Sequence, residues 1–373
     1  METMFYAQPE RVLLVGVDFK TDINFNDVLS ECVQLVEAVQ GQVVQTVCCK
    51  RNSIDSALFV GKGKAAELAQ AVIDQQIDLV IFCHPLNPSH ERNLERVLQC
   101  RVLDRVGLIL AIFALRAQTQ EGKLQVELAQ LTHLSSRLVR GYRHLKSQKG
   151  GIGLKGPGET QLETDRRLIS LKINKLKSRL TEVKKQRSTQ RKSRQKTGIR
   201  TVALVGYTNA GKSSLFNRLT KSGVFAADQL FATLDPTARK VFLNEHLSIV
   251  LADTVGFVRD LPHTLIEAFS ATLEETAFAD LLLHVVDIAN VRYEEQIDDV
   301  NKVLTEIGAQ DIPQLIIYNK IDLLPVESQP LEVIQFDQEN KPRAVYLSAY
   351  HADSTNLLRS AIGSYFFHEI NEK

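Results

Sequence analysis

The most constraining feature of this sequence is the glycine-framed run GYTNAGKS, which fits the pattern G-x-x-x-x-G-K-[S/T]. It follows an apolar run typical of a buried strand and precedes a helical run, which is the context that the pattern requires. Glycines at both ends let successive backbone N–H groups point at phosphate oxygens, and the helix adds its positive N-terminus. The run predicts a phosphate-binding loop made of Gly206, Tyr207, Thr208, Asn209, Ala210, Gly211, Lys212 and Ser213.

The last two residues of this loop carry the groups that a polyphosphate needs. The Lys212 ammonium can neutralise the β- and γ-phosphates, which gives it a catalytic role, and the Ser213 hydroxyl fits as a ligand of Mg²⁺. The loop therefore predicts a nucleoside triphosphate and Mg²⁺ as its ligands.

A second motif, NKID, predicts the base. Its final carboxylate, Asp322, can accept hydrogen bonds from N1–H and the 2-amino group of guanine. Adenine offers no such pair of donors, so we expect GTP rather than ATP. The tripeptide SAY, after a later predicted strand, can supply backbone contacts to the base. The residues expected around the base are Asn319, Lys320, Ile321, Asp322, Ser348, Ala349 and Tyr350.

A third motif, DTVG, ends the predicted strand LSIVLADTVG and lies 41 residues after Lys212. An acid at this place can hold Mg²⁺ through water, and a glycine lets a backbone N–H meet the γ-phosphate. We expect Asp253 in the first role and Gly256, as a catalytic backbone group, in the second. The nucleotide-sensing residues of this motif are Asp253, Thr254, Val255 and Gly256.

Between these motifs lies LFATLDPTAR, which offers a threonine to close over the nucleotide. Its hydroxyl would sense Mg²⁺ and the γ-phosphate, so the segment would be ordered only while GTP is bound. Both Thr233 and Thr237 fit, and the residues alone do not choose between them. The residue after DTVG is Phe257, which cannot orient a water, so we expect slow intrinsic hydrolysis that depends on a partner or another residue.

The chain separates into three regions by pattern. Alternating strand-like and helical runs up to residue 117 predict a small α/β domain with a largely parallel sheet. Its predicted strands are 11–19, 43–49, 78–84 and 106–115, and its predicted helices are 27–40, 65–76 and 88–99. The stretch GKGK at 61–64 lacks the spacing of a phosphate loop and is interpreted as a strand-to-helix turn.

Residues 118–198 are predicted to form a helical hairpin. Two apolar sets recur at spacings of three and four, which places each set on one helix face. The sets are Leu124, Leu128, Leu131, Leu134 and Leu138, then Ile169, Ile173, Leu176, Leu180 and Val183. Five glycines and a proline within 150–158 predict a flexible tip, which we interpret as a functional loop rather than a disordered linker because basic residues flank it.

Positive charge is concentrated in the same region. Residues 137–200 contain 20 Lys and Arg against 4 acids, whereas the whole chain has a net charge of only +1. A charge run is usually a solvated helix face, but segregation on this scale indicates a polyanionic partner.

Residues 199–373 alternate strand and helix again, which predicts a doubly wound, mostly parallel sheet with its ligand at the carboxyl ends of the strands. Its predicted strands are 201–207, 247–256, 280–287, 314–322 and 344–350. Five cysteines without paired spacing are interpreted as free thiols. No apolar run approaches the roughly 20 residues of a membrane helix, and the N-terminus lacks a secretory signal. We expect a cytoplasmic protein.

Together with several longer runs, these motifs resemble the HflX family of ribosome-associated GTPases along nearly the whole chain. The runs include PLNPSHERNLE, LDRVGLILAIFALRAQTQEGKLQVELAQL, GGIGLKGPGETQLETDRR, LFATLDPTAR and DTVGFVRDLPH. The resemblance implies a small α/β domain of the HflX type over 1–117, a helical hairpin that binds the ribosome or RNA over 118–198, and a P-loop GTPase domain over 199–373.

The resemblance also implies roles for single residues. It prefers Thr233 to Thr237 as a catalytic residue and as the Mg²⁺ ligand beside Ser213. It assigns the first switch to Phe231, Ala232, Thr233, Leu234 and Asp235, and the second switch to the DTVG residues. Tyr350 stands where Lys or Leu is commoner in the family.

The activity implied by the resemblance is GTP hydrolysis by a protein that binds the large (50S) ribosomal subunit and its rRNA. We expect a monomer whose slow hydrolysis the ribosome stimulates. Separation of stalled or stress-damaged ribosomes is the implied outcome, with the hairpin tip reaching towards the peptidyl-transferase centre. A GTP-gated assembly or RNA-binding factor is the alternative. An ATP-driven helicase is disfavoured by Asp322. The chain ends 23 residues after Tyr350, whereas some members of the family carry a further C-terminal domain.

Overall fold

The computed structural model describes residues 9–19, 25–141, 157–196, 199–220, 230–231, 234–235, 237–245, 247–258, 273, 276–351 and 353–371. These residues form two compact units. Unit 1 comprises Met1–Leu115 and Leu124–Leu180, and unit 2 comprises Arg116–Lys123 and Thr181–Lys373. The three-part division expected from the sequence stays a prediction.

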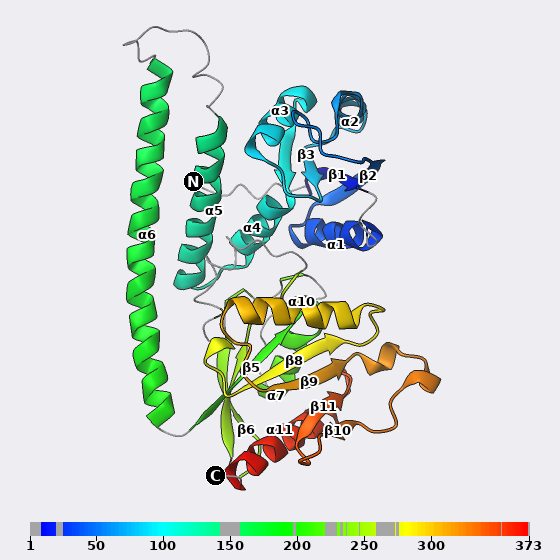
Figure 1. Ribbon diagram of the computed structural model, residues 1–373, viewed down its shortest axis with the longest axis vertical. Helices are drawn as coiled ribbons and strands as arrows, with labels where there is room; N and C mark the ends of the chain where they lie inside the picture. The colour runs from blue at the N-terminus through cyan, green and yellow to red at the C-terminus, as the bar shows by residue number, and fades with distance from the viewer. Residues whose placement is uncertain are drawn as a thin grey trace. The chain divides into compact units, whose positions relative to one another are not determined.

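Unit 1 contains a four-stranded parallel sheet with the order β2-β1-β3-β4, which confirms the predicted α/β domain (Figure 1). Its strands are β1 Arg11–Asp18, β2 Gln42–Lys50, β3 Leu79–Phe82 and β4 Arg101–Asp104. The first three helices, α1 Phe25–Ala38, α2 Lys62–Asp74 and α3 Pro88–Leu98, lie where the sequence predicts them. GKGK forms the start of α2, with Gly61 at the N-cap and residues 62–64 already in the helix, so the predicted turn is instead the N-terminus of the helix.

The predicted strand at 106–115 is wrong, because this segment is helix α4, Arg105–Arg116. The fourth strand is instead the four residues of β4, and Asp104 at its end caps the helix by accepting a hydrogen bond of 2.8 Å from the Gly107 N–H. Residues 105–110 are all buried, so α4 is apolar around most of its circumference. A helix buried on all sides loses the polar face that would reveal its period, and a run of Val, Ile and Leu then resembles a strand.

Two long helices follow, α5 Gln120–Gly141 and α6 Pro157–Lys196, and their chain directions are opposed in Figure 1. The apolar stripe on α6 is confirmed, since Leu176 and Leu180 are buried on a helix whose other described side chains are mostly exposed. The predicted flexible tip lies outside the described residues.

Helix α5 has a second buried face that the leucine spacing did not predict. Leu134 of the predicted stripe is 46% exposed, whereas Val126 and Ala129 are buried. Arg137 continues this second face one turn after His133, at the spacing of neighbours along a helix. Helix α5 therefore packs through a second face, which includes Val126, Ala129 and Arg137, in addition to its leucine stripe.

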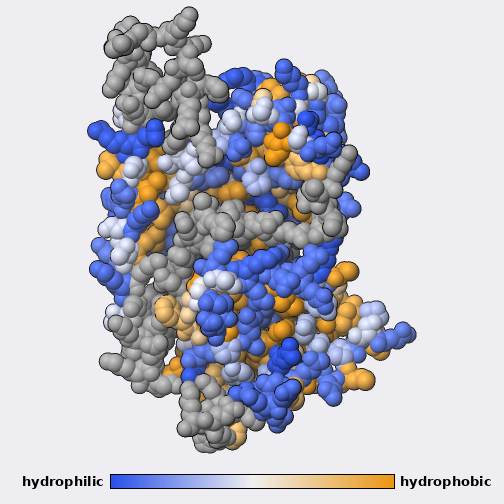
Figure 2. Space-filling view, viewed as in Figure 1, coloured by the Kyte–Doolittle hydropathy of each residue, from blue (hydrophilic) through white to orange (hydrophobic). Residues whose placement is uncertain are grey.

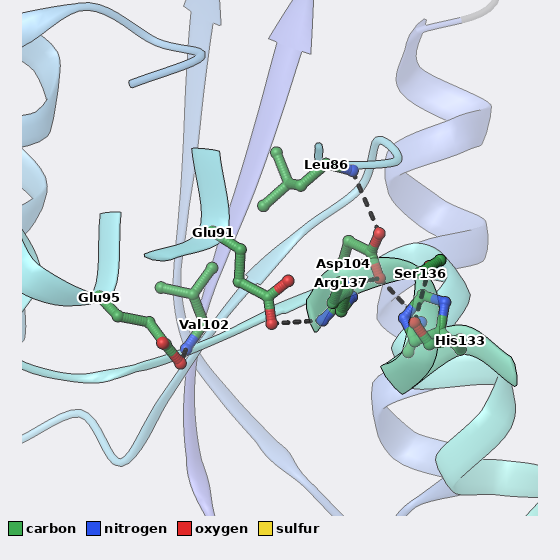
Figure 3. Close-up of polar contacts among 9 residues, drawn as sticks. Leu86, Glu91, Glu95, Val102, Asp104, His133, Ser136 and Arg137 are labelled. Atoms are coloured by element: carbon green, nitrogen blue, oxygen red, sulfur yellow. Dashed lines mark hydrogen bonds and ion pairs between the residues drawn. The ribbon is translucent and has the colours of Figure 1, made fainter. Parts of the chain in front are cut away.

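The second face of α5 carries a cluster of charges in which Asp104 is buried and Arg137 and Glu91 are partly buried (Figure 3). The Arg137 guanidinium lies between two carboxylates, contacting Glu91 and lying 3.1 Å from Asp104 Oδ1. Asp104 also accepts a 3.1 Å hydrogen bond from the Leu86 N–H. Burial raises the pKa of Glu91 to about 7, against the opposing attraction of Arg137. The cluster ties α5 to β4 and α3 within unit 1.

Substitution of Arg137 with alanine should destabilise the protein in a pH-dependent way. Removing one partner of a buried ion pair costs about 3 kcal/mol, and this loss should be largest near pH 8, where Glu91 is ionised. Because the folded pKa of Glu91 is raised to about 7, protonation removes part of the penalty at pH 6. Urea unfolding at both pH values measures the difference, with Arg96→Ala on the exposed surface of α3 as control. A loss that is equal at pH 6 and pH 8 would contradict this account.

Unit 2 contains a seven-stranded sheet with the order β10-β11-β9-β8-β5-β7-β6, and its five central strands are parallel. These five are β11 Pro342–Tyr346, β9 Gln314–Asn319, β8 Leu281–Asp287, β5 Arg200–Gly206 and β7 Ser248–Asp253, and each lies within or beside a predicted strand. The sequence missed the two antiparallel edges, β6 Thr237–Phe242 and β10 Ile334–Phe336. The mostly parallel, doubly wound sheet is confirmed.

Helices cover both faces of this sheet. On one face, α7 Lys212–Thr220 and α11 Ser354–Asn371 bury apolar side chains such as Phe216 and Phe366 in a common core. On the other face, α10 Tyr293–Glu306 packs Val300 and Leu304 into a second core. The visible surface of α10 is hydrophilic in Figure 2, as expected for an amphipathic helix that covers a sheet.

Candidate functional site

The predicted phosphate-binding loop connects β5 to α7 at the carboxyl end of β5, which lies between the parallel strands β8 and β7. Two of its glycines are required by their surroundings. Gly206 has φ of 142°, and a β-carbon there would lie 2.1 Å from the Val285 carbonyl oxygen. Gly211 has φ of 96°, and a β-carbon there would lie 2.1 Å from Asn319 Nδ2. Only glycine satisfies both the backbone angle and the space at these positions.

Lys212, the first residue of α7, is buried and directs its ammonium back over the loop. Lys212 Nζ donates hydrogen bonds to the carbonyl oxygens of Gly206, at 3.0 Å, and Tyr207, at 2.7 Å. Burial lowers its pKa to about 8, against the opposing attraction of Asp253. Because burial has removed water from around this ammonium, a nearby polyanion would stabilise its charged form. Lys212 is therefore suited to bind phosphate.

Ser213 lies beside the acid of the DTVG motif. Its hydroxyl donates a 2.9 Å hydrogen bond to Asp253 Oδ2 at the end of β7. No group of three or more His, Cys, Asp or Glu side chains that could enclose a metal ion occurs among the described residues. A hydroxyl and one carboxylate fit Mg²⁺, which keeps several waters and takes its remaining ligands from substrate phosphates.

Phe257 joins the DTVG motif to the phosphate loop through its backbone. Its N–H donates to the Gly206 carbonyl at 3.2 Å, and its carbonyl accepts from the Thr208 N–H at 2.7 Å. Its side chain is buried in the core beneath α10, with Val205 and Leu273. The two motifs therefore form one backbone unit, while the phenyl ring serves packing.

Asn319, the first residue of NKID, bridges the two sides of the site. Its Nδ2 donates to the Ala210 carbonyl in the phosphate loop, and its Oδ1 accepts from the Ala349 N–H in the SAY segment, both at 2.8 Å. The side chain is buried. The carboxamide uses a donor and an acceptor at once, which brings the phosphate loop, NKID and SAY together.

The remaining NKID and SAY residues surround this bridge. Lys320 has a positive φ of 68° and its Nζ lies 2.7 Å from Asp287 Oδ2 at the end of β8. Asp322 is exposed in a short 3-10 helix, Ile321–Leu323, whose first N–H donates to the Leu347 carbonyl. Tyr350 is 75% exposed, whereas the two residues before it are buried. The contact of Asp322 with guanine stays a prediction.

The first switch is only partly within the described residues. Phe231 and Leu234 are buried, and Ala232 and Thr233 lie outside the described residues. Thr237, the alternative threonine, is the first residue of β6 and pairs with Asp253 across the antiparallel edge. The choice between the two threonines stays a prediction.

Sequence reasoning missed the hydrogen bonds that the switch residue Asp235 makes. Its carboxylate accepts from the backbone N–H groups of Gln118 and Thr119, at 2.7 Å and 2.8 Å. These donors lie more than a hundred residues earlier in the chain, within Arg116–Lys123 of the same unit. The sequence offered one signal, a glycine at position 122 in the first turn of a predicted helix.

Three family models match successive parts of the chain. A model described as the N-terminal region of GTP-binding GTPases matches residues 26–114, and one described as their middle region matches 116–194. A third, described as a 50S ribosome-binding GTPase, matches residues 201–320. The chain is also 55% identical over 344 residues to GTPase HflX of Escherichia coli, covering 92% of this chain and 80% of the relative. The chain belongs to the HflX family of GTPases.

Other HflX proteins and one solved structure agree with this assignment. GTPase HflX of Alkalihalophilus pseudofirmus is 46% identical over 354 residues, covering 95% of this chain and 82% of the relative. The crystal structure of SsGBP with GDP is 26% identical, has a TM-score of 0.53, and is matched over 96% of this chain and 99% of that chain. This HflX protein is thus a P-loop GTP hydrolase.

Two expectations concerning the chain as a whole can also be compared with the structure. All five cysteines of this HflX protein lie within the described residues and are free. None of the helices in the described part has the length and apolar character needed to cross a membrane.

Substitution of Phe257 with glutamine should not create a faster enzyme. The backbone bonds at this residue aim the side chain into the core, so a glutamine would be buried there instead of orienting water. We expect no rise in the intrinsic rate of GTP hydrolysis and a loss of about 2–4 kcal/mol of unfolding free energy. Single-turnover assays and urea unfolding measure the two effects, with Phe257→Leu as the apolar control. A tenfold faster intrinsic rate in Phe257→Gln would contradict the assignment of this ring to packing.

Proposed function

We propose that this GTPase binds the large ribosomal subunit through rRNA and that GTP binding drives separation of the ribosomal subunits. The match of residues 201–320 to a model described as a 50S ribosome-binding GTPase supports the partner. The concentration of positive charge over residues 137–200 supports the contact with RNA.

The exposed face of α6 is the observation that carries this proposal. Arg166, Arg167, Lys172, Lys175, Lys177 and Arg179 are all exposed, against the exposed acids Asp165 and Glu182. Basic side chains on one long helix can neutralise several backbone phosphates at once. Folded RNA is read largely through phosphates and shape, so such a helix suits an rRNA partner.

For the nucleotide, we assign the phosphates to Gly206–Ser213 and the guanine to Asp322, with Asn319 holding the two parts together. Lys212 neutralises the β- and γ-phosphates, and the Gly256 N–H meets the γ-phosphate. The glycine at 256 supports this role, because a β-carbon there would lie 3.0 Å from Lys212 Nζ and 2.8 Å from Thr208 Cγ2. The site therefore has no room for a side chain at position 256.

For the metal, we assign the ligands to Ser213 and Thr233, with Asp253 acting through water. The 2.9 Å contact between the Ser213 hydroxyl and Asp253 supports the first and last of these roles. When bound, Mg²⁺ stabilises the negative charge that develops on the phosphate oxygens. Thr233 would then be ordered only with GTP, which gives the first switch its two states.

Intrinsic hydrolysis is slow in this proposal, and the ribosome stimulates it. The burial of the Phe257 ring supports this view, since it leaves no side chain at that position to orient the attacking water. Stimulation then comes from ribosomal groups or from residues that the ribosome rearranges.

The direct test measures GTP hydrolysis with and without purified large subunits, followed by sedimentation of whole ribosomes with a non-hydrolysable GTP analogue. We expect stimulation by large subunits and conversion of whole ribosomes to free subunits. If whole ribosomes stay intact while immature large subunits bind tightly, the protein is an assembly factor instead. Hydrolysis that is unchanged by large subunits would contradict both readings.

Removal of positive charge from the C-terminal half of α6 should weaken ribosome binding and flatten its salt dependence. Each phosphate contact that is lost should reduce the slope of log K against log salt by about 0.7–0.9. The charges to remove are Arg187, Arg191, Lys192 and Arg194. The control removes four charges elsewhere, at the exposed residues Lys50, Lys62, Arg96 and Lys302. An unchanged salt slope in the α6 variant would mean that this segment is only a solvated face.

A further inference from the structure

Asp235 of the first switch holds the start of helix α5. Its Oδ2 accepts hydrogen bonds from the Gln118 N–H at 2.7 Å and the Thr119 N–H at 2.8 Å, and its Oδ1 accepts from the Thr119 hydroxyl. All three residues belong to unit 2, because Arg116–Lys123 is part of that unit. We name this set of contacts the switch clamp.

The switch clamp lies at a helix N-terminus. Thr119 caps α5, since its hydroxyl accepts from the Gly122 N–H at 3.0 Å and its carbonyl accepts from the Lys123 N–H. Backbone N–H groups at the start of a helix have no acceptor within the helix, and a carboxylate can accept their hydrogen bonds. The positive end of the helix dipole also stabilises the negative charge of that carboxylate. A neighbouring residue commonly supplies such a carboxylate, whereas here it comes from a segment 116 residues away.

Gly122 gives independent evidence that the clamp is a built contact. A β-carbon at this residue would lie 2.1 Å from Asp235 Oδ1. Glycine is a poor residue for a helix interior, yet here it makes room for the carboxylate in the first turn of α5. The chain therefore carries a glycine that α5 itself does not need.

The position of Asp235 in the chain connects the clamp to the nucleotide. It lies two residues after Thr233, so once Thr233 is fixed Asp235 can move no further than about 7 Å from it. On its other side β6 begins at Thr237, which pairs with Asp253 of the DTVG motif. The clamp thus anchors the chain between the position of Thr233 and the start of β6.

We propose that Asp235 is a positioning residue for GTP: by gripping the start of α5 it orders the switch segment from which Thr233 reaches the γ-phosphate. This inference rests on the proposed role of Thr233. The Asp235 clamp and the contact of Thr233 with GTP would both order the same short segment. Once one of them has ordered it, the other costs less conformational entropy, so each contact strengthens the other. By linkage, GTP also tightens the grip of Asp235 on the start of α5.

The test compares affinities for a non-hydrolysable GTP analogue and for GDP in the full chain. We expect Asp235→Ala to weaken binding of the analogue about tenfold while GDP binding changes less than about twofold, because only the γ-phosphate engages the switch. Asp235→Asn keeps one acceptor oxygen and should recover part of the loss. Equal effects on the analogue and on GDP, or none on either, would overturn the inference.

A second variant disrupts the switch clamp by changing helix α5 instead of Asp235. Gly122→Ala improves the helix propensity of α5 but leaves no room for the Asp235 carboxylate. We expect the same selective loss of analogue affinity as in Asp235→Ala. The matched control is Gly63→Ala, in the first turn of α2, where a β-carbon meets nothing within 4 Å. If Gly122→Ala behaves like the control, the clamp does not position the switch.

Thr233→Ala separates failure of this inference from failure of the proposed switch. Selective loss of analogue affinity in Thr233→Ala, without any in Asp235→Ala, would leave the proposed function standing and overturn the clamp. Amide hydrogen exchange measures directly how tightly the backbone N–H groups of the switch clamp are held. The Gln118 and Thr119 amides should exchange more slowly with the GTP analogue than with GDP, and equal exchange in the two states would also overturn the inference.

Discussion

The nucleotide site depends on the buried carboxamide of Asn319. One side chain joins three segments that are far apart in the chain, through the Ala210 carbonyl and the Ala349 N–H. A buried carbonyl or amide left without a partner costs about 1–3 kcal/mol, so the bridge strongly favours one arrangement of the loops. The glycine at 211 follows from the same contact, because a β-carbon there would collide with Asn319 Nδ2.

Around this bridge, backbone hydrogen bonds fix the parts and charged side chains act on the ligand. Phe257 pairs with both Gly206 and Thr208, so the end of the DTVG motif is held directly against the phosphate loop. Lys212 donates to two backbone carbonyls, and its burial away from water lowers its pKa to about 8. The phosphates of GTP would offset the free-energy cost of burying this ammonium, which makes a buried lysine a strong binding group for a polyanion.

Much of this arrangement follows from local sequence patterns, because a loop motif, a strand and a helix are short-range features. The α/β unit, the phosphate loop and the central parallel strands were predictable for that reason. Helix α4 was not, since burial on nearly all sides removed its polar face. Strand β6 was also missed; among the described strands it pairs with β7 alone, at an antiparallel edge of the sheet. The bond from Asp235 to Gln118 spans 117 residues, and no short-range pattern encodes it.

The most direct test of the central claim is the affinity of Asn319→Ala for GTP and GDP. Loss of the carboxamide leaves two buried backbone groups without their partners, so we expect both nucleotides to bind more weakly by about 2–4 kcal/mol, with the fold intact by circular dichroism. Equilibrium titration with a fluorescent nucleotide measures the change. Affinities within about twofold of the unmodified protein, which correspond to less than about 0.5 kcal/mol, would contradict the claim that this bridge holds the site together.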